Sequence, residues 1–190
     1  MLVDLALKVV AGMSVGRWAD LGTGSGAIAV ALSRAMPAIP GHAVDLSADA
    51  LALARTNLEA LSPEGRWHLH QGRWWDPLEP WWGRLDLVVC NPPYIPSELI
   101  HNLDPVVRDH EPHLALAGGI DGLHAIREVV AGAGRALAPA GWILIEHHHD
   151  QSDSVLELLK EAGLTSIRAA QDLEGIKRFA MACRSRSQPS

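Results

Sequence analysis

The stretch that decides the fold is "RWADLGTGSGAIAVALSRAM", Arg17 to Met36. It begins as a short apolar strand, "RWADL", and ends as "GAIAVALSRAM", whose apolar residues have the spacing of a buried helix. The loop between them is rich in glycine, which lets the backbone approach a ligand closely at the N-terminus of the helix. The stretch therefore predicts a βα unit with a binding loop.

Strands and helices continue to alternate after this unit. "GHAVDL" predicts a second strand, and Ser47 is placed to cap a helix whose apolar face includes Leu61. Further strands are expected in "RWHLHQ", "LDLVVC" and "GWILIEH", and a final helix, "VLELLKEAG", precedes two terminal strands, "LTSIRAA" and "IKRFAMAC". This alternation predicts an α/β fold with a doubly wound, mostly parallel sheet.

The bulk composition limits the class of protein. At 190 residues and 48% hydrophobic content the chain is long enough for one buried domain, which we place at residues 1–183, followed by a disordered tail at 184–190. The formal net charge is −6, so the chain has no broad basic surface for a nucleic-acid backbone. Nucleic acid is therefore disfavoured as a partner.

Targeting and redox signals point to the cytoplasm. No stretch approaches the roughly 18 apolar residues of a membrane span, and Asp4 lies where a signal peptide would be positive. Cys90 and Cys183 lack metal-ligand spacing and lie near the ends of different apolar runs. We expect a cytoplasmic protein with no membrane partner and with both cysteines reduced in the core.

The glycine loop, "DLGTGSGA", leaves the identity of its ligand open. Gly22, Gly24 and Ala27 satisfy the dinucleotide fingerprint G-x-G-x-x-G/A. Asp45, at the end of the second strand, suits the ribose hydroxyls of any nucleoside-bearing cofactor. The loop and the strand-end acid together favour such a cofactor over a turn with no ligand.

A second unusual stretch is "VVCNPPYIP", Val88 to Pro96, which contains the only tyrosine of the chain. Proline fixes φ and has no backbone N–H to donate, so two prolines in a row end the strand and stiffen the following loop. A stiff loop at a strand end is a suitable place to hold reacting groups. We therefore expect chemistry at this loop.

Several motifs occur together in an order that resembles a known family. "DLGTGSG", "VDLS" and "NPPY" resemble the class I S-adenosylmethionine-dependent methyltransferases that modify amino or amide nitrogens. Within that group, "NPPYI", "HEPHLAL" and "GGIDGL" are similar to the HemK/PrmC family, from Leu2 to about Cys183. That family methylates N5 of the glutamine in the GGQ motif of peptide-chain release factors. The resemblance implies a Rossmann-like sheet with an antiparallel terminal strand, S-adenosyl-L-methionine as cofactor and a release factor as partner, and we expect a monomer.

The resemblance also implies catalytic roles for Asn91, Pro92, Pro93 and Tyr94. The side-chain carbonyl of Asn91 and the backbone carbonyl of Pro92 can accept the two N–H groups of a glutamine amide, and Tyr94 supplies an aromatic wall. Fixed carbonyl dipoles would stabilise the positive charge that develops on the nitrogen. The substrate-binding set is Asn91, Pro92, Tyr94 and Glu111 of "HEP", and the alternative for Glu111 is a solvated loop acid.

The implied cofactor site extends to the third strand. Where related enzymes often carry an acid near the adenine, this chain has "GRWW", with Arg73 in that place and Trp74 as a candidate to stack on the ring. The alternative is that the tryptophans of this region, Trp74, Trp75, Trp81 and Trp82, pack around the edge of the sheet. The residues assigned to cofactor binding are Asp20, Gly22, Thr23, Gly24, Gly26, Asp45, Leu46, Arg73, Trp74 and Asn91.

The run "EHHHDQ" resembles a metal-binding sequence. On a strand, His147 and His149 would point together and His148 away, and no further Cys or His at ligand spacing joins them locally. We therefore expect no metal site in this run.

The N-terminus and two rival functions complete the sequence-based hypotheses. The family carries a small helical domain before the position of Leu2, and we expect this chain to lack it. Leu2, Leu5 and Val9 are then candidates for the exposed apolar surface, unless they face the chain's own sheet. One alternative is an adenine-N6 or guanine-N2 nucleic-acid methyltransferase, because an exocyclic amine on a base poses the same chemical problem to the "NPPY" residues as a glutamine amide does. A cofactor-binding module that is inactive without its N-terminal domain is the other alternative.

Overall fold

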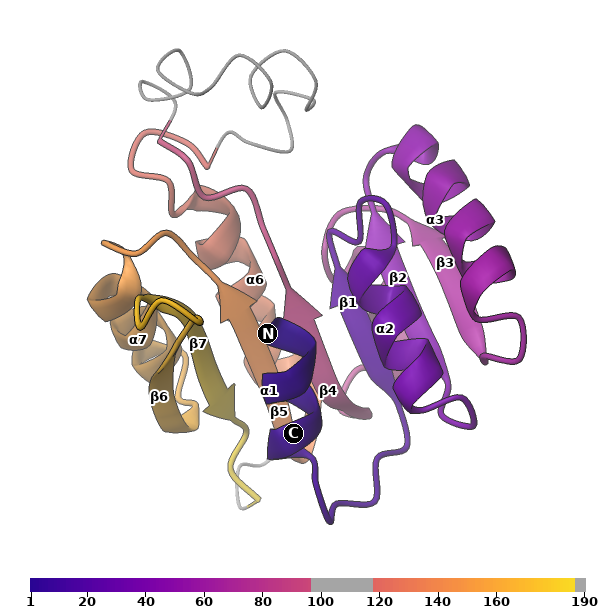
Figure 1. Ribbon diagram of the computed structural model, residues 1–190. Helices are drawn as coiled ribbons and strands as arrows, with labels where there is room; N and C mark the ends of the chain where they lie inside the picture. The colour runs from indigo at the N-terminus through magenta and orange to yellow at the C-terminus, as the bar shows by residue number, and fades with distance from the viewer. Residues whose placement is uncertain (97–117, 187–190) are drawn as a thin grey trace.

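Seven strands form one sheet in the computed structural model, which describes residues 1–96 and 118–186 (Figure 1). The strand order is β3-β2-β1-β4-β5-β7-β6. Each strand overlaps a segment where the sequence predicts one, and β5 starts earlier than expected. The strands are β1 (Trp18–Leu21), β2 (Gly41–Asp45), β3 (Trp67–Gln71), β4 (Leu85–Cys90), β5 (Leu137–Glu146), β6 (Thr165–Gln171) and β7 (Lys177–Cys183).

The strand directions confirm the predicted fold class. The neighbours from β3 through β2, β1 and β4 to β5 are all parallel. β7 is antiparallel to both β5 and β6. Parallel neighbours need a crossover between them, whereas antiparallel neighbours can be joined by a short turn. The sheet is therefore doubly wound and mostly parallel, with an antiparallel terminal strand.

Helices cover both faces of the sheet (Figure 1). Ser47 caps the helix after β2 as predicted, because its side chain accepts the amide N–H of Ala50 at 3.2 Å. Leu61 at the end of that helix is exposed and lies outside the buried stripe that the sequence predicts. One face packs against α1 (Leu2–Val9), α2 (Ala27–Ala35) and α3 (Ala48–Leu61), and the other against the 3-10 helix η1 (Asp76–Trp81), α6 (His124–Ala136) and α7 (Ser152–Glu161).

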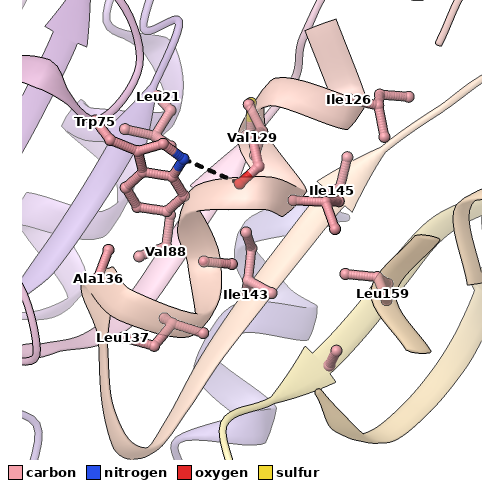
Figure 2. Close-up of a cluster of buried hydrophobic side chains, with 14 of the residues drawn as sticks. Leu21, Trp75, Val88, Ile126, Val129, Ala136, Leu137, Ile143, Ile145 and Leu159 are labelled. Carbon is pink, nitrogen blue, oxygen red and sulfur yellow. Dashed lines mark hydrogen bonds between the residues drawn. The ribbon is translucent and has the colours of Figure 1, made fainter. Parts of the chain in front are cut away.

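The core between the sheet and α6 is shown in Figure 2. Val88 of β4 and Ile145 of β5 meet Ile126 and Val129 of α6, and all four are fully buried. The indole Nε1–H of Trp75 donates to the carbonyl oxygen of Val129 at 2.9 Å (Figure 2). A large ring whose polar atom is paired adds buried apolar area without the cost of an unpaired N–H. Trp75 therefore ties the segment after β3 to α6.

The structure corrects the expectation of an exposed apolar stripe on the first helix. Leu2 is buried in the core, and Leu5 and Val9 are partly buried against the same core. α1 contacts β4, β5 and α2. The helix therefore uses this stripe to cover the chain's own sheet, which is the alternative that the spacing left open.

The C-terminal segment also differs from the prediction. Arg184, which the sequence places in a disordered tail at 184–190, is buried, and its Nη1 donates to the carbonyl oxygen of Leu137 at 2.6 Å. Residues 187–190 lie outside the described residues. Cys90 and Cys183 are buried as expected. In the two described ranges, no helix has the length and apolarity needed to cross a membrane.

The strand order places a switch point between β1 and β4. β2 and β3 lie on one side of β1, and β4 and β5 lie on the other. Leu21, the last residue of β1, pairs with Cys90, the last residue of β4. Ligands of doubly wound sheets bind at the carboxyl ends of the strands at such a point. The glycine loop and Asn91 therefore leave the sheet side by side.

Candidate functional site

The loop after β1 is held by a carboxylate from the end of β2. Asp45 accepts the amide N–H of Gly24 at 2.8 Å and that of Ser47 at 2.9 Å, one on each oxygen. A carboxylate has about four acceptor positions, so two backbone donors leave capacity for ligand hydroxyls. Leu46, which follows, is 60% exposed and offers an apolar side chain at the same edge. The structure thus brings the loop, the strand-end acid and Leu46 together.

Glycines give this loop its shape. Gly22, Gly24 and Gly26 have φ angles of +71°, +55° and +81°. These angles lie in the left-handed region that glycine adopts without steric cost. A Cβ on Gly26 would lie 3.0 Å from the Cα of Ala54 in α3, whereas a Cβ on Gly24 would meet nothing within 4 Å. The loop is therefore packed against α3 at one end and open at Gly24, as a ligand cradle requires.

Asp20 is a buried acid at the base of the loop. The Thr23 hydroxyl donates to its Oδ2 at 2.6 Å, while Oδ1 has no hydrogen-bond partner. Burial raises the pKa of Asp20 to about 7. Interactions with the Thr23 hydroxyl and the Ala29 backbone oppose this rise, and the nearby charge of Asp45 adds to it. A positively charged ligand would favour the ionised carboxyl. Two acids around one glycine loop therefore fit a cationic nucleoside cofactor.

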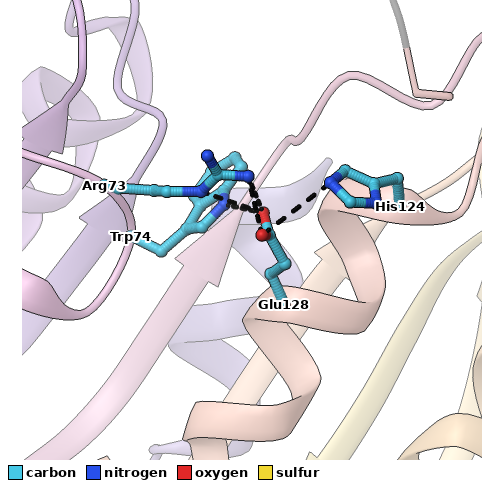
Figure 3. A network of polar contacts seen from close by, with 4 residues as sticks. All are labelled: Arg73, Trp74, His124 and Glu128. Carbon is cyan, nitrogen blue, oxygen red and sulfur yellow. Dashed lines mark hydrogen bonds and ion pairs between the residues drawn. The ribbon is translucent and has the colours of Figure 1, made fainter.

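A polar network joins the segment after β3 to α6 (Figure 3). Glu128 accepts two hydrogen bonds from the Arg73 Nη2, at 2.6 and 2.7 Å, and one from the Trp74 Nε1 at 2.9 Å. The His124 Nε2 lies 3.8 Å from the same carboxylate. One carboxylate thus fixes two neighbouring side chains that come from a different part of the sequence.

Trp74 is held against the glycine loop. Its φ angle is 44°, which is uncommon for a residue with a side chain. A Cβ on Gly22 would lie 3.1 Å from the Trp74 ring, so the ring sits beside the first glycine of the loop. Arg73 is instead paired with Glu128 and is about half exposed. The structure therefore places Trp74, rather than Arg73, at the wall of the glycine loop.

The remaining tryptophans of this region follow the packing alternative. Trp75 is buried in the core, and Trp81 and Trp82 are partly buried against it. The Trp81 ring lies 4.2 Å from the ring of His42 in β2, and the Arg135 guanidinium lies 4.6 Å from the centre of the Trp82 ring. These three rings therefore pack against the sheet and its helices.

The loop after β4 starts with an exposed amide beside the glycine loop. Asn91 is exposed, Pro92 is buried, and Pro93 and Tyr94 are partly buried. Because the next two residues are prolines, the chain leaves the sheet in a restricted direction after Asn91. The arrangement presents the Asn91 side chain at the switch point, where a group to be modified would meet a bound cofactor.

Tyr94 lies near the carboxyl end of β5. The Tyr94 and His148 ring centres are 6.4 Å apart. Burial raises the pKa of Glu146, and the charge of Arg178 and a hydrogen bond from Tyr94 oppose that rise. The backbone carbonyl of Tyr94 accepts a hydrogen bond from the side chain of Gln151 at 2.9 Å. Tyr94 is therefore held from both ends, by Glu146 at the end of β5 and by Gln151 after it.

The sequence-based site lacks three residues that the structure brings in. Glu128, Glu146 and Gln151 contact assigned residues, but none of them was assigned a role. Glu146 had a signal, since it is an acid at the carboxyl end of a strand. Glu128 and Gln151 carry no local signal, because their partners lie 54 and 57 residues away. Glu111, assigned to the substrate, lies outside the described residues.

The three histidines do not share faces as predicted. β5 ends at Glu146, so strand alternation does not apply to them. His147 is buried, and its Nδ1 lies 2.7 Å from the carbonyl oxygen of His148. The His148 and His149 rings lie 4.2 Å apart. Among the described residues, no group of three or more His, Cys, Asp or Glu side chains has the geometry to hold a metal ion.

A hollow of about 490 Å³ lies beside the end of the same loop, at Pro96. Half of its lining residues are charged, among them Asp121, Arg127 and Asp150. None of the residues assigned from the sequence lines it, although Gln151 does. The glycine loop, and not this hollow, is therefore the candidate cofactor site.

Comparison with known proteins identifies the family. The family described as "Methyltransferase small domain" matches residues 4–105, which include the glycine loop and the "NPPY" loop. The chain belongs to the methyltransferase small domain family. The match also covers β1 through β4, the part of this methyltransferase domain that forms the switch point.

The curated relatives of this chain confirm the resemblance noted in the sequence. A "Release factor glutamine methyltransferase" of Prochlorococcus marinus is 55% identical over 185 residues, which are 96% of this chain and 63% of the relative. One of the same name from Thermosynechococcus vestitus is 41% identical over 96% of this chain and 63% of its own length. The chain thus spans somewhat under two thirds of the length of these relatives.

Solved structures show the same fold. The hMettl16 catalytic domain, solved in complex with the MAT2A 3'UTR hairpin 6, has a TM-score of 0.71 with 14% identity, over 98% of this chain and 69% of that one. At this identity the likeness concerns the fold alone. It agrees with a class I methyltransferase sheet.

Proposed function

We propose that this chain transfers a methyl group from S-adenosyl-L-methionine to the side-chain amide nitrogen, N5, of the glutamine in the GGQ motif of a peptide-chain release factor. The observation that carries the proposal is the position of Asn91 and its two prolines beside the glycine loop, at the switch point of a methyltransferase sheet. The names of the relatives support the choice of acceptor.

The residues around the glycine loop fit this cofactor. The buried Oδ1 of Asp20 lacks a partner, the loop is open at Gly24, and Asp45 keeps acceptor capacity for ribose hydroxyls. When bound, the cofactor supplies an electrophilic methyl group on a sulfonium centre. Trp74 and the exposed Leu46 offer apolar surfaces for the adenine. Asp20 and Asp45 give the cradle the negative charge that a cationic ligand needs.

The chain's part in the reaction is to orient a weak nucleophile. An amide nitrogen is a poor nucleophile because its lone pair is delocalised into the carbonyl. In this proposal the Asn91 side-chain oxygen and the Pro92 carbonyl accept the two amide N–H groups, so the nitrogen faces the methyl group. As the N–C bond forms and the S–C bond breaks, fixed carbonyl dipoles stabilise the positive charge on nitrogen. The proton leaves after transfer, when the nitrogen is far more acidic.

The test is methylation of a full-length release factor by this chain with S-adenosyl-L-methionine, read out by mass spectrometry of the peptide that contains the GGQ motif. We expect a gain of one methyl group on the glutamine, and none on a release factor in which that glutamine is replaced by alanine. Methyl transfer to adenine or guanine in nucleic acid but not to the release factor would replace this function with its rival. Cofactor binding without transfer to either would favour a binding module.

The proposed cofactor and cellular location have separate tests. Calorimetry should show binding of S-adenosyl-L-methionine and its demethylated product, and no binding of a nicotinamide dinucleotide. We also propose that the protein is cytoplasmic, as a release-factor acceptor implies, and that it is a monomer. Fractionation of cells tests the location, and sedimentation of the purified chain tests the oligomeric state.

A further inference from the structure

Three segments that are distant in sequence meet at the side chain of Gln151. They are the loop at 91–96, the turn at 118–122 and the segment 147–151 between β5 and α7. The turn contains most of the motif "GGIDGL", to which no role has been assigned so far. Gln151 is 6% exposed, so its contacts are made inside the protein.

Every polar atom of the Gln151 side chain has a backbone partner. Its Nε2 donates to the carbonyl oxygen of Tyr94 at 2.9 Å and to that of Asp121 at 3.4 Å. Its Oε1 accepts the amide N–H of His148 at 2.9 Å. A buried amide with its polar atoms paired in this way rigidifies the segments that it joins. Gln151 therefore fixes the end of the "NPPY" loop relative to β5 and α7.

The "NPPY" loop needs such a contact because it has few donors of its own. Pro92 and Pro93 have no backbone N–H, so this part of the loop can be tied down only through its carbonyl groups or by packing. The carbonyl of Tyr94 binds Gln151, and the carbonyl of Ile95 accepts the amide N–H of Gly118 at 2.8 Å. Both tethers follow the prolines directly, and both come from outside the loop.

Gly122 leaves room for the junction at which the Gln151 side chain meets the Tyr94 carbonyl. A Cβ at this position would lie 2.3 Å from the Tyr94 carbonyl oxygen and 2.4 Å from the Gln151 Nε2. Both distances are far below van der Waals contact, so a side chain here would push the two partners apart. Gly122 also has a φ angle of +72°, in the left-handed region. The turn therefore depends on glycine for both its shape and its closeness to Tyr94.

We propose that Gln151 is a positioning residue for methyl transfer, which acts by holding the Tyr94 carbonyl and thereby the direction of the Asn91 amide and the Pro92 carbonyl. The inference rests on the proposed function and extends it to a residue outside the "NPPY" motif. Gln151 makes no contact with the glycine loop, so its loss should affect turnover and leave cofactor affinity unchanged. A misplacement of about 1 Å at a reacting group can lower a rate by about a hundredfold.

The first test is spectroscopic and needs no substrate. The chain has one tyrosine, so labelling with carbonyl-13C tyrosine gives a single resonance that reports the Tyr94 carbonyl. Gln151→Met keeps the length of the side chain and removes its donor, and we expect this resonance to shift. In Thr165→Val, which removes a hydroxyl donor to the Cys183 carbonyl, the resonance should stay in place. An unchanged resonance in Gln151→Met would overturn the proposal.

The second test separates binding from chemistry. With a release factor as acceptor, Gln151→Met should lower kcat by about tenfold or more and change the Kd for the demethylated cofactor product by less than twofold. Thr165→Val should leave both values unchanged. A purely structural role would lower cofactor affinity together with kcat or leave both unchanged, and either result would overturn the proposal.

Gly122→Ala provides an independent variant with a matched control. Gly175 also has a left-handed φ, +79°, but a Cβ there would meet nothing within 4 Å. Gly175→Ala therefore reports the strain of an alanine at this φ, without the clash. We expect Gly122→Ala to shift the Tyr94 resonance and lower kcat as Gln151→Met does, and Gly175→Ala to do neither. Equal behaviour of the two alanine variants would contradict the proposed junction.

These tests separate the positioning role from the proposed function. If the wild-type chain methylates no glutamine, the proposed function fails, and the Tyr94 resonance still decides whether Gln151 holds the loop. If the wild-type chain methylates glutamine and Gln151→Met does so at the same kcat, the positioning role alone fails.

Discussion

The proposed site has two halves, a cofactor half around the glycine loop and an acceptor half around the "NPPY" loop, and different kinds of contact hold them. In the cofactor half, Asp45 binds the Gly24 amide, and the two residues are 21 positions apart in adjacent βα units. In the acceptor half, Gln151 binds the Tyr94 carbonyl across 57 positions. The first contact joins segments that any βαβ unit brings together. The second depends on how loops from separate strands meet, so the acceptor half should be the more sensitive to distant substitutions.

The largest expected effect separates the halves directly. Asn91→Ala removes an acceptor for the substrate amide and should lower kcat by about a hundredfold or more, because one positioned polar group is lost. The Kd for the demethylated cofactor product, measured by calorimetry, should change little. Collapse of cofactor affinity together with turnover would show that Asn91 has a structural role in the cofactor half.

A matched control lies in α3. Asn57 also carries an amide side chain, and its Nδ2 donates to the Ser25 carbonyl in the glycine loop at 2.9 Å. Asn57→Ala should therefore raise the cofactor Kd by about two- to twelvefold, the usual range for one hydrogen bond, with kcat unchanged at saturating cofactor. A reduced kcat with a constant cofactor Kd would show that the two halves do not have separate roles in binding and turnover.

The next effect concerns stability within the cofactor half. Asp20 has a pKa of about 7 in the folded protein, mainly because of burial, compared with an ordinary 3.8. Between pH 3.8 and about 7, Asp20 is therefore protonated in the folded state and ionised in the unfolded state. The free energy of unfolding falls as the pH rises through this window. Above pH 7 the loss is complete and constant.

Asp20→Asn removes that ionisation and should raise the free energy of unfolding at pH 8 by up to about 4 kcal/mol relative to wild type. Urea unfolding at pH 8 and at pH 5 measures the gain, which should be smaller at pH 5. Burial lowers the pKa of His42 from its ordinary 6.5 to about 3, so both proteins lose stability as the pH falls below 6.5. The difference between them therefore isolates Asp20. A gain that does not depend on pH would show that ionisation is not its cause.

A smaller effect tests how the glycine loop is held. Asp45→Asn keeps one acceptor oxygen and turns an amide group toward one of the two backbone N–H groups. We expect the cofactor Kd to rise by about tenfold, as expected for a lost hydrogen bond to a charged group. Calorimetry checks this value. A cofactor affinity equal to that of wild type would show that the loop keeps its shape without the carboxylate.

The smallest effect should come from the network in Figure 3. Glu128→Gln can still accept the Trp74 N–H but loses the charge that pairs with the half-exposed Arg73. Exposed ion pairs contribute about 0–1 kcal/mol, so the cofactor Kd should rise by about fivefold or less. Glu59→Gln in the exposed pair with Arg55 on α3 is the control and should have no effect. A tenfold or larger rise in the cofactor Kd for Glu128→Gln would show that the position of Trp74 contributes more to cofactor binding than an exposed ion pair can.

The sequence predicted the local structure around the glycine loop well because the signals for this region are local. The strand, the glycine loop and the cap at Ser47 depend on neighbours within a few residues, and their contacts agree with those expectations. The role of Trp74 remained open, because the ring is directed toward Gly22 by Glu128 on a distant helix. The stripe on α1 was assigned to the wrong environment, since spacing defines a face but not what the face packs against.

The sequence by itself determined the order of strands and helices, the place of the glycine loop and the residues that begin the acceptor loop. These follow from hydrophobic period, glycine conformation and the missing N–H of proline, which act along the chain. Only the tertiary structure decided that Gln151, Gly122 and Tyr94 meet, that Glu128 holds Trp74, and that Arg184 is buried. The physical reason is that a buried polar group must find a partner in three dimensions, and its sequence neighbours do not specify that partner.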